Sequence, residues 1–164
     1  MTRLRVAAPP LALQSLVAFG AGAIGVLAFA PFRWWPLGVL SLALLFGLWS
    51  REARAGRTFA IGFAWGLGLF TGGVSWIYVS LHVYGNMPAV LAGASTFLFC
   101  CYLSIYPGLA GICARQLRNR FAIGPSAGLV LVIPACFVMF EYLRGWLLTG
   151  FPWLTMGYAQ APGG

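Results

Sequence analysis

Long runs of apolar residues divide this chain, and short polar stretches separate them. The runs cover about residues 11–29, 37–49, 59–79, 89–114 and 124–142. They are continuous, whereas a strand of a membrane barrel alternates apolar and polar residues. Because a helix that crosses a bilayer needs about 20 apolar residues, we predict an all-α bundle of about five transmembrane helices. The second run is short, and we expect it to gain a turn from its flanks.

The composition agrees with this prediction. Hydrophobic residues make up 61% of the 164 positions and charged residues only 7%, whereas a soluble domain carries about 25% charged residues. We therefore predict one integral membrane domain over residues 1–164. The basic start, the apolar run and the A-x-A sequence at 28–30 imitate a signal peptide. We expect the first run to be retained as a helix, because it is long for a signal peptide and Pro31 would follow the cut.

The charged residues indicate the topology. The chain has ten arginines and no lysine, and its only acids are Glu52 and Glu141. With five spans, eight arginines fall on one side of the membrane and two on the other, so the positive-inside rule predicts a cytoplasmic N-terminus in a bacterial inner membrane. Arginines in short loops between apolar runs also argue against nucleic-acid binding. The first group is Arg3, Arg5, Arg51, Arg54, Arg57, Arg115, Arg118 and Arg120, and the second is Arg33 and Arg144.

Small and sulfur-containing residues point to packing. Residues 62 and 66, and again 68 and 72, are glycines four apart, a spacing that lets two helices approach closely. All four cysteines lie inside apolar runs without a C-x-x-C pair, and the single His82 is far from them in the sequence. We therefore interpret the cysteines as small core residues and expect no metal and no cofactor.

Glu141 and Arg144 are the candidate charged pair of the site. They are three positions apart, so they share one face of a helix if the fifth run continues that far. A carboxylate near membrane depth is costly unless it is paired, and such groups are candidates for function. Two interpretations stay open, a structural ion pair at the helix end and a direct role in binding.

An irregular segment at the outer interface, residues 143–160, is predicted to follow this helix. Pro152 lacks an N–H and restricts Phe151, so this stretch cannot be a regular helix interior. The aromatic turn formed by Phe151, Pro152 and Trp153 would suit an acyl chain at the headgroup boundary. An aromatic membrane anchor is the alternative. The residues alone thus indicate a membrane protein with an outward-facing lipid or small-molecule site.

The order of motifs resembles the N-terminal membrane domain of bacterial apolipoprotein N-acyltransferases. Each motif alone is weak, but together they cover nearly the whole chain in one order. They are LAFAPFRWWP at 27–36, IGFAWGLGLF at 61–70, SWIYVS at 75–80, EYLRGW at 141–146 and TGFPW at 149–153.

The resemblance implies a function. Members of the family move an acyl chain from a phospholipid, mainly phosphatidylethanolamine, to the α-amino group of the diacylglyceryl-cysteine of an apolipoprotein. This is the last step of lipoprotein maturation. The chemistry is similar to that of nitrilases, with a Glu-Lys-Cys triad that forms a thioester in a periplasmic domain. A tryptophan that the family needs for activity matches Trp153, and the implied role is to line the lipid entrance.

The chain departs from the family in one respect. The resemblance implies that the catalytic lysine, cysteine and glutamate lie beyond position 164, so no catalytic residue is expected in this chain. We expect the chain to be a fragment or truncated product that is inactive alone. Two alternatives are a non-catalytic membrane module that binds lipid and, less favoured, a transporter. A transporter would need polar residues at mid-membrane depth, and the first four runs have no charged residue in their interiors.

Overall fold

The computed structural model describes residues 9–160, and these residues form a bundle of helices without a β-strand. The predicted all-α membrane bundle is confirmed. A helix lies in each of the five predicted runs. The long helices are α1 (Leu11–Gly25), α2 (Trp35–Arg51), α3 (Ala55–Gly73), α5 (Ala89–Arg120) and α7 (Ile133–Arg144), with short turns η1 (Val26–Ala28), α4 (Trp76–Val79), η2 (Ser80–Tyr84), α6 (Pro125–Ala127), η3 (Gly128–Val132), η4 (Leu147–Thr149) and η5 (Met156–Gln160).

Three stretches of the described chain are long and apolar enough to cross a membrane. They are Leu11–Ala28, Ala89–Arg120 and Pro125–Arg144. A fourth span forms if α3 and the α4–η2 segment count as one, although the two are bent by 50° relative to each other. Helix α2 has 17 residues, two more than predicted at each end, and is too short to be counted among these spans.

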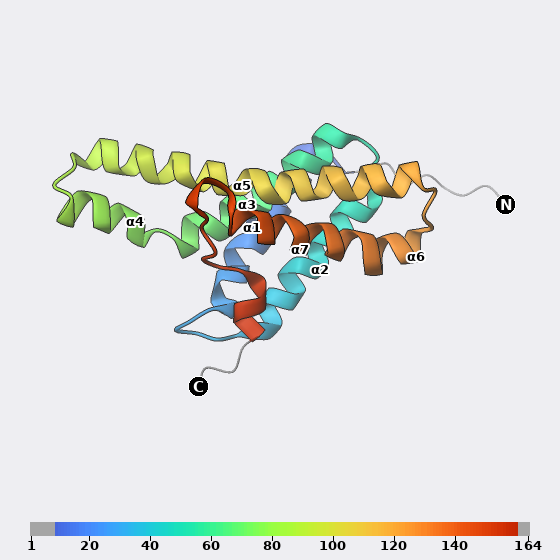
Figure 1. Cartoon of the computed structure of the whole chain (residues 1–164), viewed down its shortest axis with the longest axis horizontal. Helices are drawn as coiled ribbons and strands as arrows, with labels where there is room; N and C mark the ends of the chain where they lie inside the picture. Colours follow the sequence, from blue (N-terminus) through green and yellow to red (C-terminus); the bar gives the residue numbers. More distant parts are fainter. Residues whose placement is uncertain (1–8, 161–164) are drawn as a thin grey trace.

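Helix α3 lies at the centre of the bundle, between α1 and α5 (Figure 1). Glycines allow this close packing, as their spacing predicted. A Cβ atom at Gly22 would collide with the carbonyl of Trp65, and one at Gly62 would lie 2.6 Å from the carbonyl oxygen of Pro107. Gly68 lies in the same way against the backbone of Phe19. The glycines of α3 therefore serve two faces, one toward α1 and one toward α5.

Buried polar groups join the first three long helices. The Ser41 hydroxyl on α2 donates to the carbonyl of Ala21 on α1 at 2.6 Å and accepts the indole N–H of Trp65 on α3 at 2.9 Å. Ser41 and Trp65 are almost completely buried. Since an unsatisfied polar group is expensive away from water, this chain of bonds fixes how the three helices face one another.

The outer surface of the bundle is apolar. Side chains such as Leu16, Phe97 and Val130 are more than half exposed, while the interior holds Leu45, Ile61 and Leu103 and related residues. So large an apolar surface is typical of a protein whose solvent is lipid.

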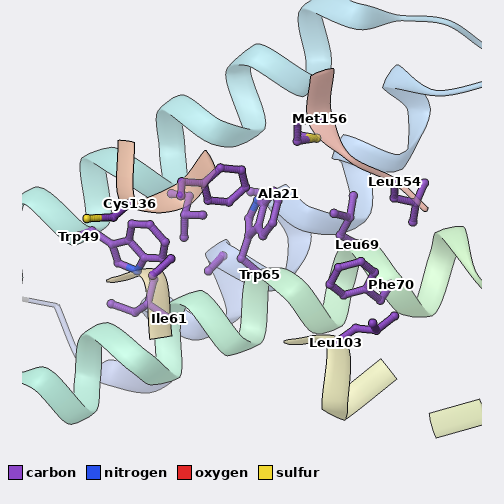
Figure 2. Close-up of a cluster of buried hydrophobic side chains, with 14 of the residues drawn as sticks. Ala21, Trp49, Ile61, Trp65, Leu69, Phe70, Leu103, Cys136, Leu154 and Met156 are labelled. Carbon is purple, nitrogen blue, oxygen red and sulfur yellow. The ribbon is translucent and has the colours of Figure 1, made fainter. Parts of the chain in front are cut away.

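The segment after α7 turns back into the core. Figure 2 shows Leu154 and Met156 pointing into the same cluster as Leu69 and Phe70 of α3. Both side chains are at least nine-tenths buried. The interfacial segment is therefore packed against the bundle at the end where α1 and α3 finish and α2 begins.

Candidate functional site

The charged pair lies in the last turn of α7, beneath the segment that turns back. Arg144 is only 2% exposed, and its Nη2 atom is 3.9 Å from Oε1 of Glu141. The two side chains share one helix face, as their spacing predicted. The guanidinium also lies over the ring of Phe70, 5.2 Å from the ring centre, so it is enclosed between α7, α3 and the following loop.

Arg144 is bonded mainly to the backbone of that loop. Its Nη1 donates to the carbonyl oxygens of Phe151 at 2.5 Å and Trp153 at 2.7 Å, and its Nη2 donates to the hydroxyl of Thr155 at 3.3 Å. The carboxylate of Glu141 accepts the backbone N–H of Met156 at 2.9 Å. The pair thus fixes the loop over residues 151–156, because charge-assisted hydrogen bonds are stronger than neutral ones.

Gly150 makes the turn that brings the loop over the pair. Its φ is +76°, and a Cβ atom there would overlap the carbonyl of Gly145. The N–H of Phe151 then donates to the carbonyl of Arg144 at 3.0 Å. Only glycine fits this combination of backbone angle and close approach.

The three aromatic-turn residues point to different places. The Phe151 ring packs edge-on against Phe99 of α5, with ring centres 5.0 Å apart. Trp153 is 54% exposed, and its ring packs against Trp76 at 5.9 Å. Pro152 and Trp153 line a surface groove, whereas Phe151 packs against the core.

This groove has a volume of about 1260 Å³. Its walls come from three parts of the chain: the segment that joins α1 to α2, the end of α3 with the start of α4, and the segment after α7. Most of its lining is apolar or aromatic, and Arg33 is its only charged residue. The lining residues are Val26, Ala28, Phe29, Ala30, Pro31, Phe32, Arg33, Trp35, Gly72, Gly73, Trp76, Pro152, Trp153, Leu154, Tyr158, Ala159 and Gln160.

The structure therefore divides the five predicted site residues into two groups. Trp153 and Pro152 line the groove, and Phe151, Glu141 and Arg144 support it from within. The sequence did not indicate that the wall at 26–35 belongs to the same site. One signal was present, since the tryptophan-rich loop at 31–36 and the tryptophan at 76 fall on the same predicted side of the membrane as residue 153.

The remaining candidates lie elsewhere. The ring Nδ1 of His82 is 2.8 Å from the carbonyl oxygen of Met87, which closes the turn before α5. The sulfur atoms of Cys113 and Cys136 are 3.8 Å apart between α5 and α7. The described residues contain no group of three or more side chains placed to hold a metal ion.

Together, the fold and the groove define a helical membrane domain that presents an open, mainly apolar groove at one end of its bundle. The sequence model of the family described as "Apolipoprotein N-acyltransferase N-terminal domain" matches residues 21–164. The chain belongs to this family.

Individual relatives agree with the family match. The chain is 44% identical over 164 residues to an apolipoprotein N-acyltransferase of Ralstonia nicotianae, covering 99% of this chain and 30% of the relative. It is 43% identical over 149 residues to one of Nitrosomonas europaea, covering 90% and 29%. It is 46% identical over 150 residues to one of Photobacterium profundum, covering 88% and 27%. The chain therefore spans less than a third of the length of these relatives.

Proposed function

We propose that this chain is the membrane domain of a phospholipid:apolipoprotein N-acyltransferase. The enzyme would take an acyl chain from phosphatidylethanolamine and attach it to the α-amino group of a diacylated apolipoprotein. Membership of the family and the names of the relatives support the reaction class. The groove beside Trp153 supports a lipid substrate.

The groove is the observation that carries this proposal. Small-molecule pockets usually have volumes of roughly 300–1,000 Å³, and this groove is larger and open. Its apolar walls suit acyl chains, while Arg33, Tyr158 and Gln160 offer polar contacts for a headgroup. The exposed ring of Trp153, held against Trp76, would line the entrance for the lipid.

Glu141 and Arg144 act in this proposal as positioning residues. Their polar atoms are directed at the loop over residues 151–156, and Arg144 is almost fully buried. They would set the place of Trp153 without touching the lipid. This is the structural interpretation of the pair, extended to the shape of the groove.

We also propose that the groove faces the periplasm and the N-terminus lies in the cytoplasm of an inner-membrane protein. The described arginines at positions 51–57 and 115–120 lie at the end of the bundle opposite the groove, where α2 and α5 end and α3 begins. The positive-inside rule puts such an end on the cytoplasmic side.

Residues 1–164 alone should not transfer an acyl group. A thioester needs an activated thiol, but the four cysteines lie within α5 and α7, and the sequence has no lysine. An assay with phosphatidylethanolamine and a diacylated lipopeptide should therefore give no product with the isolated chain. Turnover by that chain would contradict the assignment of catalysis to residues outside it.

Binding of phosphatidylethanolamine tests the groove directly. We expect the purified chain in detergent to bind a fluorescent phosphatidylethanolamine, and Trp153→Ala to weaken this binding while helical circular dichroism stays unchanged. Trp146→Ala is the matched control, because Trp146 is also exposed, its ring lies beside Tyr142, and it is not part of the groove lining. Equal binding by both variants would contradict the role of the groove.

A further inference from the structure

The end of the bundle opposite the groove carries arginines that serve two different purposes. Arg115 Nε donates to the carbonyl of Ala53 at 2.8 Å, and Arg118 Nη2 donates to the carbonyl of Ser50 at 3.3 Å. These bonds tie the end of α5 to the turn between α2 and α3. The two side chains are half-buried and belong to the internal structure of this end.

Arg57 is also used internally. Its Nε is 3.0 Å from Oε2 of Glu52, and its Nη2 donates to the carbonyl of Pro9 at 2.9 Å and to the side-chain oxygen of Gln14 at 3.3 Å. It therefore joins the start of α1 to the turn between α2 and α3.

Three further arginines at this end have no such role. Arg51, Arg54 and Arg120 are exposed, and their side chains make no hydrogen bond or ion pair within residues 9–160. Arg51 and Arg54 flank the turn that Arg115 and Arg118 bind, and Arg120 follows two residues after Arg118. All three positive charges thus lie at the same end of the bundle, where α2 and α5 end and α3 begins.

No side-chain carboxylate of the chain is left to balance them. The sequence contains only two acids. Glu52 pairs with Arg57 and accepts the backbone N–H groups of Ala53 and Arg54, each at 3.0 Å. Glu141 lies at the other end of the bundle with Arg144. The counter-charge for the three exposed arginines must come from outside the chain.

Apolar side chains beside these arginines indicate what supplies it. Phe121 directly follows Arg120 and is 68% exposed, and Leu117, one turn earlier, is 38% exposed. An aromatic ring and aliphatic groups next to arginines are typical of the boundary between headgroups and acyl chains. A nucleic acid or a soluble acidic protein would leave these apolar side chains in water.

We propose that Arg51, Arg54 and Arg120 form a basic face that binds anionic phospholipid headgroups, with Phe121 in the adjoining acyl boundary. The ligand is a phospholipid with a net negative charge, such as phosphatidylglycerol, in the leaflet opposite the groove. This second lipid site is independent of the proposed acyl donor, which would bind at the other end of the bundle.

Lipid binding by the full chain in detergent micelles tests the proposal. Native mass spectrometry can compare phosphatidylglycerol with phosphatidylcholine of the same acyl chains. We expect the wild-type chain to prefer phosphatidylglycerol. Arg51→Gln/Arg54→Gln/Arg120→Gln should lose most of this preference, by about fivefold for each arginine removed, since one basic residue near an anionic surface contributes about 1 kcal/mol.

Two controls make the result specific. Arg51→Lys/Arg54→Lys/Arg120→Lys keeps the charges and should retain the preference, and Asn119→Ala changes an uncharged exposed residue beside Arg120 and should leave it unchanged. The preference should also weaken as salt is added, because exposed charges are screened. Equal binding of the two lipids by the wild-type chain, or an unchanged preference in the triple glutamine variant, would overturn the proposal.

Discussion

The two ends of this bundle use arginine in opposite ways. At the groove end a buried arginine, Arg144, is 2% exposed and bonds to three groups of one loop. At the other end several arginines bind the backbone or Glu52, and the side chain of one of them, Arg57, is 22% exposed. One end therefore depends on one buried cation, and the other depends on a distributed set near the surface.

The difference shows how burial changes what an ion pair does. A buried charge costs several kcal/mol in desolvation, so its hydrogen bonds are required rather than optional. An exposed ion pair contributes about 0–1 kcal/mol. The loop that carries Trp153 is therefore expected to keep one conformation, because another course would deprive the buried Arg144 of the carbonyls of Phe151 and Trp153. The basic face, by contrast, remains available to an external partner.

The largest effect is expected from Arg144→Gln. The substitution removes the cation that binds the carbonyls of Phe151 and Trp153 and leaves the carboxylate of Glu141 without its partner. Breaking a buried pair on one side costs about 3–5 kcal/mol. We expect a loss of that size in the free energy of unfolding, measured by denaturant titration in micelles, together with weaker phosphatidylethanolamine binding.

The double variant Arg144→Gln/Glu141→Gln separates the pair from its single members. It removes both charges, so part of the lost stability should return. If Arg144→Gln alone lowers the free energy of unfolding no more than a surface substitution does, the buried pair does not hold the loop, and the contrast between the two ends fails.

A middle-sized effect is expected from Gly150→Ala. The backbone at φ +76° and the nearby carbonyl of Gly145 leave no room for a Cβ atom, and backbone strain of this kind costs on the order of 1–3 kcal/mol. The free energy of unfolding should fall accordingly. Gly157→Ala, in the same segment but facing open space, should change it little. Equal costs for both variants would show that the turn adapts freely.

The pattern of the sequence predicted the bundle better than it predicted the site. Apolar runs and glycines four apart follow from the helix period and from close packing, which are local properties. The shared face of Glu141 and Arg144 follows from the same period. The bend of 50° between α3 and the α4–η2 segment was not predicted. No proline marks it, and the adjacent glycines at 72 and 73, where α3 ends, were interpreted as packing residues although such a pair is also a breaking signal.

The loop after α7 depends on long-range contacts, which explains why the sequence left its role open. Its course requires the turn at Gly150 and a guanidinium that donates to carbonyls seven and nine residues later. The groove wall at 26–35 depends on how α1 packs against α3. Neither arrangement has a periodic signature, although the residues themselves could be selected as candidates from their chemistry.

The smallest effects test the other end of the bundle, where Arg57→Gln and Arg54→Gln form a matched pair. Arg57→Gln removes two hydrogen bonds and an ion pair to Glu52. Hydrogen bonds to charged groups contribute roughly 1.5–3 kcal/mol, and ion pairs near the surface contribute less. The substitution should therefore lower the free energy of unfolding by about 1–2 kcal/mol. Arg54 is exposed, and its side chain bonds to nothing within residues 9–160. Its replacement should change the free energy of unfolding by less than about 0.5 kcal/mol. Denaturant titration in uncharged micelles measures both.

A cost for Arg54→Gln as large as that for Arg57→Gln would mean that Arg54 is structural. The division between internal and outward-facing arginines would then have to be abandoned at that position.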